Sequence, residues 1–92
     1  MSIAIIGGND CMAHRYKQLC KEYGCKVKVF TQPQGIKNQI GTPDLLVLFT
    51  NTVSHKMIKS ALSSVSNETA TIVRSHSSSL AALKDILSKH TM

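Results

Sequence analysis

The sequence predicts a single small α/β domain built on a parallel β-sheet. Short apolar runs alternate with longer amphipathic stretches, so that the 92 residues read β-α-β-α-β-α-β-α. The run Leu45–Phe49, "LLVLF", contains no polar residue, which is typical of a central parallel strand covered on both faces. Residues 1–92 therefore form one domain, slightly below the usual size of about 100 to 150 residues.

The first strand and helix follow from hydrophobic periodicity. Residues 2–6 are a short apolar run that ends at Gly7 and Gly8, which indicates a buried strand and a tight turn. Apolar residues at helical spacing come next and predict a helix that ends at Gly24. This apolar stripe consists of Met12, Tyr16, Leu19, Cys20 and Tyr23.

The second strand is predicted at an edge of the sheet. Residues 25–30 alternate apolar side chains with Lys26 and Lys28, and lysines suit an edge that must resist further pairing. The segment 32–41 contains one proline and two glycines and is expected to be a loop with a short helix. So short a helix leaves this edge thinly covered, which makes it a candidate dimer surface.

The second half of the chain predicts two further strand–helix units. The strands are expected at 45–49 and 69–74. In the helix between them, the inward-facing residues are expected to be Met57, Ile58, Ala61, Leu62 and Val65. In the last helix they are Leu80, Leu83, Ile86 and Leu87.

These elements predict the topology of the sheet. Crossover connections between parallel strands are right-handed, and the doubly wound arrangement places the second strand beside the first and the first beside the third. We therefore expect a small Rossmann-like or flavodoxin-like three-layer sandwich, whose four-stranded parallel sheet has the order 2-1-3-4.

Composition narrows the range of partners. Eleven Lys and Arg against five Asp and Glu give a formal charge of +6, which favours anionic partners. The lysines are scattered, and aromatic residues make up 4% of the chain, so little stacking on nucleic-acid bases is expected. A basic nucleic-acid or protein-binding module remains an alternative function. Chains this short bury a modest fraction of their surface, so a homodimer is expected.

The cysteines and the apolar runs predict the cellular compartment of the protein. The three cysteines, Cys11, Cys20 and Cys25, form no Cys-x-x-Cys pair, and the sequence has no secretory signal pattern. A cytoplasmic protein with free thiols is therefore expected. The longest apolar run is Leu45–Phe49, which is too short to span a bilayer, so no membrane is expected among its partners.

Three polar loops follow strands of the predicted sheet and are expected to meet at one edge. In open α/β sheets, ligands bind outside the carboxyl ends of the strands, and unpaired N–H groups at helix starts attract anions. We therefore expect a ligand site in these loops. Its candidate residues are Gly7, Gly8, Asn9 and Asp10 after the first strand, Asn51, Thr52, Ser54 and His55 after the third, and Arg74, Ser75, His76, Ser77 and Ser78 at the fourth.

Helix capping is the plainer explanation of each loop taken alone. The residue types that cap helices occur in every loop, and the expected caps are Asn9 or Asp10, Asn51 or Thr52, and Ser77 or Ser78. One cap needs one side-chain oxygen, whereas "RSHSSS" at 74–79 offers four serines with a histidine and an arginine. This surplus leads to the main hypothesis, a non-catalytic domain of regulatory or sensor type that binds a small anion.

Other chemistries are less well supported by the sequence. Gly7 and Gly8 match neither the dinucleotide fingerprint nor the phosphate loop of nucleotide hydrolases. His55, expected in the first turn of its helix, and His76 suggest an alternative, a small enzyme that uses them as acid and base on a phosphoryl or carboxyl substrate. No convincing nucleophile accompanies them. Arg74 either pairs with Asp10 or binds an anion in bidentate fashion.

Cofactors are not identified from the sequence. His55, His76, Asp10 and Cys11 lack any local metal-ligand spacing, so no metal site is predicted.

Taken together, "IIGG", "TNTVSHKM" and "RSHSSS" resemble a family of small bacterial Rossmann-like proteins catalogued as a domain of unknown function. The resemblance covers nearly the whole chain. Members sometimes carry the automatic label dihydroorotate dehydrogenase, but that enzyme holds flavin in a barrel of roughly 250 residues, which this chain cannot build. Longer relatives with an added helical domain are associated with haem and dioxygen. The added domain has no counterpart here, so the resemblance does not assign an axial-ligand role to His55 or His76.

Overall fold

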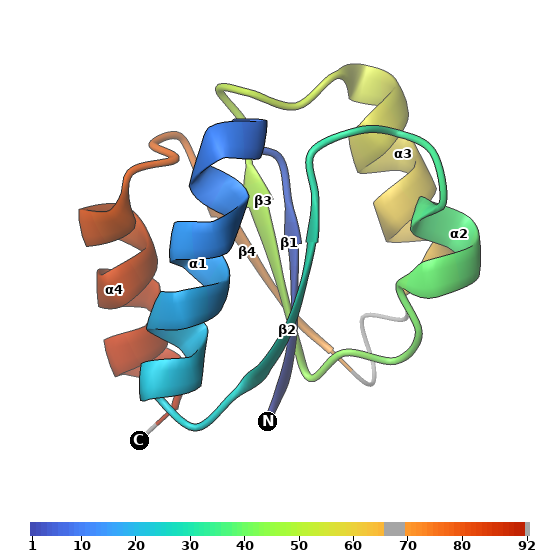
Figure 1. The fold of residues 1–92 in the computed structure, drawn as a ribbon. Helices are drawn as coiled ribbons and strands as arrows, with labels where there is room; N and C mark the ends of the chain where they lie inside the picture. Colours follow the sequence, from blue (N-terminus) through green and yellow to red (C-terminus); the bar gives the residue numbers. More distant parts are fainter. Residues whose placement is uncertain (66–69, 92) are drawn as a thin grey trace.

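The computed structural model describes residues 1–65 and 70–91 and confirms the predicted fold (Figure 1). Its four-stranded parallel sheet has the order β2-β1-β3-β4. The strands are Ser2–Ile6 (β1), Lys26–Phe30 (β2), Leu45–Phe49 (β3) and Thr71–Ser75 (β4). The helices are Asp10–Glu22 (α1), Ile36–Gln39 (α2), His55–Ser64 (α3) and Leu80–His90 (α4).

The fourth strand differs slightly from its predicted limits. The expected start, Thr69, lies outside the described residues, and the strand ends at Ser75 instead of Arg74. In the last register pair, Ser75 lies beside Phe49, so β4 reaches as far as the end of β3. Within the described ranges, no helix is long and apolar enough to cross a membrane.

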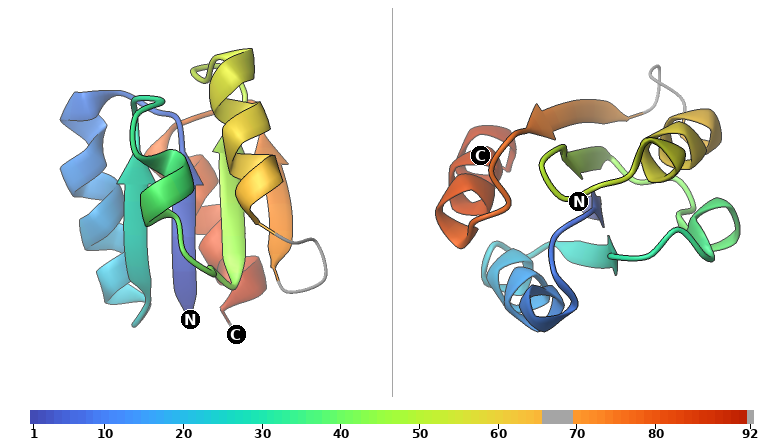
Figure 2. Two further views of the ribbon diagram at one scale, coloured as in Figure 1. Left: turned by 90° about the vertical axis from the view of Figure 1, so that its right-hand side faces the viewer. Right: turned by 90° about the horizontal axis from the view of Figure 1, so that it is seen from above.

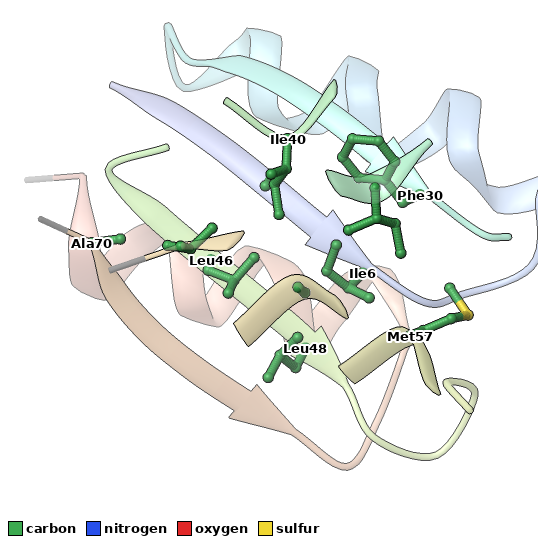
Figure 3. Packing of buried hydrophobic residues seen from close by; sticks show 11 residues of the cluster. Ile6, Phe30, Ile40, Leu46, Leu48, Met57 and Ala70 are labelled. Atoms are coloured by element: carbon green, nitrogen blue, oxygen red, sulfur yellow. The ribbon is translucent and has the colours of Figure 1, made fainter. Parts of the chain in front are cut away.

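Helices cover the sheet on both faces and make a three-layer sandwich. Figure 2 shows α1 and α4 on one face and α2 and α3 on the other. Each face has its own hydrophobic cluster. Ile6, Leu48 and Met57 belong to the cluster beneath α2 and α3, part of which is drawn in Figure 3. The opposite cluster contains Tyr16, Phe49 and Leu87.

The central strands supply most of the core. All five residues of β3 are buried, as the unbroken apolar run predicts. Along β1, Ile5 packs into the cluster under α1 and α4, and Ile6 packs into the opposite cluster, because successive side chains of a strand point to opposite faces.

The edge position predicted for the second strand is confirmed. β2 pairs with β1, and Lys26 and Lys28 are exposed. The Lys28 ammonium donates a hydrogen bond to the backbone carbonyl of Gln39 at 2.7 Å, so the lysine joins the edge strand to the end of α2. The apolar side chains of Val27 and Val29 remain half-buried beneath α1.

The topology also defines a switch point. Neighbouring strands β1 and β3 are followed by helices on opposite faces, α1 and α3 (Figure 2). The chain therefore leaves the sheet in opposite directions from two adjacent strand ends, which is the place where doubly wound proteins bind their ligands.

Candidate anion site at the carboxyl ends of the strands

Two glycines turn the chain at the end of β1. Gly7 and Gly8 have φ angles of 109° and 84°, which side chains rarely allow. A Cβ atom on Gly7 would lie 2.5 Å from the Val53 Cγ1 atom, and one on Gly8 would lie 2.6 Å from Cε2 of Tyr16. The predicted tight turn is confirmed, and close packing against both neighbours requires glycine at each position.

The β3–α3 loop closes over this turn. The backbone N–H of Gly8 donates to the Thr52 hydroxyl at 2.7 Å, and this hydroxyl donates to the Phe49 carbonyl at 3.2 Å. Val53 packs against Gly7 on the same side. Thr52 and Val53 therefore occupy the switch point beside the two glycines.

The helix caps differ from those predicted. The Ser54 hydroxyl caps α3 by accepting a hydrogen bond from the Met57 N–H at 3.2 Å, so the expectation of Asn51 or Thr52 was wrong. The physical reason lies in the turn between them and the helix. Thr52 is bonded to Gly8, and Val53 is packed against Gly7, so the helix begins only at His55. His55 is thus in the first turn of α3, as predicted.

The cap of α4 also differs from the predicted residues. The Ser79 hydroxyl accepts from the Ala82 N–H at 3.2 Å, whereas the expected caps were Ser77 and Ser78. Asn9 takes the N-cap position of α1 as expected, but its side chain makes no capping hydrogen bond.

Much of the serine surplus is hydrogen-bonded within its own loop. The Ser75 hydroxyl donates to the Ser77 carbonyl at 2.8 Å, and the Ser77 hydroxyl donates to the Ser79 hydroxyl at 3.1 Å. The Ser75 carbonyl accepts from the Thr50 N–H at 2.8 Å, which ties the β4–α4 loop to the end of β3. These bonds explain several hydroxyls without a ligand. They also show that the β3–α3 and β4–α4 loops are adjacent.

Arg74 and Asp10 are not brought together. The Asp10 carboxylate accepts a hydrogen bond from the Thr31 hydroxyl, and the part of the chain that the structure describes contains no Arg74–Asp10 ion pair. β3 lies between β1 and β4 and separates the two residues. Arg74 is exposed and borders a hollow of 460 Å³ beside α3 together with Leu62 and Ile72.

The two candidate histidines are both exposed. Neither His55 nor His76 makes a side-chain hydrogen bond to any residue in the described ranges. His55 lies beside Lys56 in the first turn of α3, which contains no acidic residue. By contrast, Asp10 occupies the first turn of α1. The start of α3 is therefore the more electropositive of these two helix ends.

Tyr16 makes a contact at this edge of the sheet that the sequence did not reveal. Helical spacing places it correctly in the core, but its hydroxyl also donates to the Ser78 carbonyl at 2.5 Å. Its ring packs on Gly8 and lies 5.4 Å from that of Phe49. Burial raises the pKa of Tyr16, the hydrogen bond to Ser78 acts in the opposite direction, and Cys11 raises it further. No pattern in the sequence signals such a bond across 62 residues.

Thr31 is the second such contact. It follows β2 directly and fixes the carboxylate of Asp10 at the start of α1. The sequence signal for this contact was the position of Thr31. A polar residue directly after β2 lies at the carboxyl ends of the strands, where the three predicted loops also lie.

Comparisons with known proteins identify one family. A family model described as "Uncharacterized protein conserved in bacteria (DUF2325)" matches residues 2–90. No curated protein and no solved structure matches the chain. The match covers all eight helices and strands described above.

Proposed function

This chain belongs to the DUF2325 family, described as uncharacterized proteins conserved in bacteria, and we propose that it binds a small anion as a domain of regulatory or sensor type. The proposed site is the start of α3, with Asn51, Ser54, His55 and Lys56. The first turn of this helix contains the exposed side chains of His55 and Lys56 and no acidic residue, which supports the proposal.

Backbone donors support the site. In the described residues, the N–H groups of His55 and Lys56 have no acceptor, whereas the next one, that of Met57, is bonded to Ser54. Unpaired N–H groups at a helix start point along the axis toward an anion, and the helix dipole adds to the attraction. The exposed ammonium of Lys56 strengthens this field.

The adjacent loop contributes further charge. The Thr50–Ser75 hydrogen bond holds the β4–α4 loop beside the β3–α3 loop. Arg74 and His76 are the sequence neighbours of Ser75. We propose that they flank the anion together with Ser77 and Ser78. The guanidinium of Arg74 suits a phosphoryl or carboxylate group because its donors match two oxygens.

The ligand is proposed to be small. Thr52 and Val53 occupy the switch point beside Gly7, where a dinucleotide would need space for its pyrophosphate. Asp10 adds negative charge at the start of α1, which is the usual pyrophosphate position. Gly7, Gly8 and Asn9 therefore serve to support the neighbouring loop. An anion the size of phosphate fits this arrangement better than a nucleotide.

The enzyme alternative receives no independent support. It requires His55 and His76 to share a substrate atom or to be hydrogen-bonded, and both are exposed without a side-chain bond in the described ranges. The nucleic-acid alternative also stays a prediction. The exposed lysines that would make its contacts are spread over α1, β2, α2, α3 and α4.

We also propose that the protein forms a homodimer through the β2 edge in the cytoplasm. A hollow of 570 Å³ runs along this edge beside Val27, Val29 and Gln39, where α2 is only four residues long. The three cysteines are all free, which suits a reducing compartment. Sedimentation equilibrium tests the dimer, and a monomer at micromolar concentration would contradict it.

Thermal unfolding tests the anion site. With phosphate at a hundredfold excess over its Kd, linkage predicts a gain of about 2.7 kcal/mol in the free energy of unfolding. The comparison solution contains sodium chloride at the same ionic strength. Lys56→Gln should reduce the gain, and so should Arg74→Ala.

The matched control is Lys59→Gln, because Lys59 is also exposed on α3 but lies beyond its first turn. It should leave the phosphate effect unchanged. No stabilisation by phosphate, or an equal loss in the Lys56 and Lys59 variants, would contradict the proposed site.

A further inference from the structure

Two cysteines are brought together where α1 ends and β2 begins. The N–H of Cys25 donates to the Cys20 carbonyl at 3.0 Å, and the N–H of Gly24 donates to the Lys21 carbonyl at 2.9 Å. Gly24 has a φ of 72°. These bonds define a Schellman motif, in which the side chains at the positions of Cys20 and Cys25 frequently make contact.

The backbone geometry is compatible with a disulfide. A hydrogen bond of 3.0 Å between the Cys25 nitrogen and the Cys20 oxygen holds the two Cα atoms within about 7 Å of each other. Disulfides usually join Cα atoms about 4.4 to 6.8 Å apart. Both side chains also lie on the same face of the sheet, because Cys20 belongs to the core cluster under α1 and Cys25 packs against that cluster.

The two thiols have different surroundings. Cys20 is fully buried, whereas Cys25 is partly exposed and its thiol donates to the Tyr23 carbonyl at 3.6 Å. Burial, together with the neighbouring Cys25, raises the pKa of Cys20 to about 12. An oxidant in solution therefore meets Cys25 first, and Cys20 is held beside it as the second thiol.

We propose that Cys20 and Cys25 are a redox-active pair that closes to a disulfide when a hydroperoxide oxidises Cys25. In the first step, the Cys25 sulfur attacks a peroxide oxygen, an S–O bond forms, the O–O bond breaks, and water or an alcohol leaves with the thiol proton. In the second step, the Cys20 sulfur attacks the Cys25 sulfenic acid. The S–S bond forms, the S–O bond breaks, and the departing hydroxide takes the Cys20 proton and leaves as water.

The two thiols lose two electrons and the peroxide gains them. A thiol or a dithiol reductant reverses it by exchange. The disulfide would cross-link the end of α1 to the start of β2, a connection already made by the Schellman hydrogen bonds, so closure needs little movement of the backbone.

The experiment uses the full chain carrying Cys11→Ser, which removes the exposed third thiol. The protein is treated with hydrogen peroxide and digested with trypsin without reductant. Trypsin cleaves after Lys21, between the two cysteines, and the intramolecular disulfide should join peptides 18–21 and 22–26. The intact mass should fall by two hydrogen atoms, and dithiothreitol should restore it.

A second variant separates the two steps. With Cys20→Ala added, the sulfenic acid on Cys25 has no partner and should be trapped by dimedone, whereas the parent should show at most a small dimedone adduct. With Cys25→Ala added instead, the buried Cys20 should stay unmodified.

Two results would overturn the proposal. One is a parent protein whose two peptides stay unlinked after peroxide treatment. The other is a Cys25 that dimedone labels equally well with and without Cys20. The linked-peptide measurement decides the matter even where a Cys20 variant folds poorly.

Discussion

The N–H of Gly8 and the hydroxyl of Thr52 form a hydrogen bond of 2.7 Å that joins the β1–α1 loop to the β3–α3 loop. The bond lies at the switch point of the sheet, where β1 and β3 end side by side. It closes a position that related architectures leave open for a ligand. It also gives Thr52 a role that explains why the cap of α3 is Ser54.

Gly8→Ala should destabilise the protein more than Gly24→Ala. Both glycines have positive φ, at 84° and 72°, so each substitution carries a backbone cost of about 1 to 2 kcal/mol. A Cβ on Gly8 would also lie 2.6 Å from the ring of buried Tyr16, whereas one on Gly24 would meet nothing within 4 Å. Overpacking adds about 1 to 3 kcal/mol. Urea denaturation measures both, and equal losses would contradict the packing described around Gly8.

Ser54→Ala should destabilise the protein by about 1 kcal/mol, the usual cost of losing an N-cap. Asn51→Ala is the matched control. Asn51 is exposed and makes no side-chain hydrogen bond within the described ranges. Its substitution should therefore change the free energy of unfolding by no more than about 0.5 kcal/mol. The free energy of unfolding from denaturant titration checks both variants, and the reverse order of effects would restore Asn51 as the cap.

Asp10→Asn should lower stability by about 0.3 to 1 kcal/mol, because a carboxylate in the first turn of α1 interacts favourably with the helix dipole. The loss should shrink as salt is added, since the site is exposed. Thr31→Val removes the hydroxyl donor but keeps the charge, so its effect should depend less on salt. Denaturant midpoints at low and high salt distinguish the two, and an Asp10→Asn effect that is independent of salt would argue against the dipole.

Alkaline pH should weaken the fold through Cys20. Its pKa is raised from 9.0 to about 12 by burial and by Cys25, so folding favours the neutral thiol. This contribution is fully present below about pH 9 and is lost as the pH rises toward 12, with a slope of up to about 1.4 kcal/mol per pH unit. Tyr16, whose pKa is also raised, contributes in the same direction.

The measurement is the urea midpoint of the reduced protein at several pH values. Cys20→Ala should reduce the loss of stability per pH unit and leave only the part that Tyr16 contributes. If wild type and variant lose stability equally across this range, the thiol is not the titrating group.

The arrangement of the sheet could be predicted because its signals are local. An unbroken apolar run marks β3 as central, and alternating Lys26 and Lys28 mark β2 as an edge. The caps could not be predicted, since several suitable side chains precede α3 and contacts with Gly7 and Gly8 decide among them. These contacts join residues more than 40 positions apart.

The candidate site was predicted only as a set of loops. The sequence indicated that three loops share an edge, and the hydrogen bonds Gly8–Thr52 and Thr50–Ser75 join them in pairs. It could not indicate which polar groups are already bonded within the protein. Asp10 illustrates this, because its partner is Thr31 on the far side from β4, and the proposed pairing with Arg74 fails for lack of proximity.

The most direct test of the proposed anion site is a phosphate titration followed by the backbone amide resonances of the protein in solution. If the anion binds at the start of α3, the N–H signals of His55 and Lys56 should shift progressively and saturate, while those of Asp10 and Cys11 at the start of α1 stay in place. Sodium chloride at equal ionic strength should not reproduce the shifts. Amides of α3 that fail to respond, or a larger response at α1, would contradict the proposed anion site.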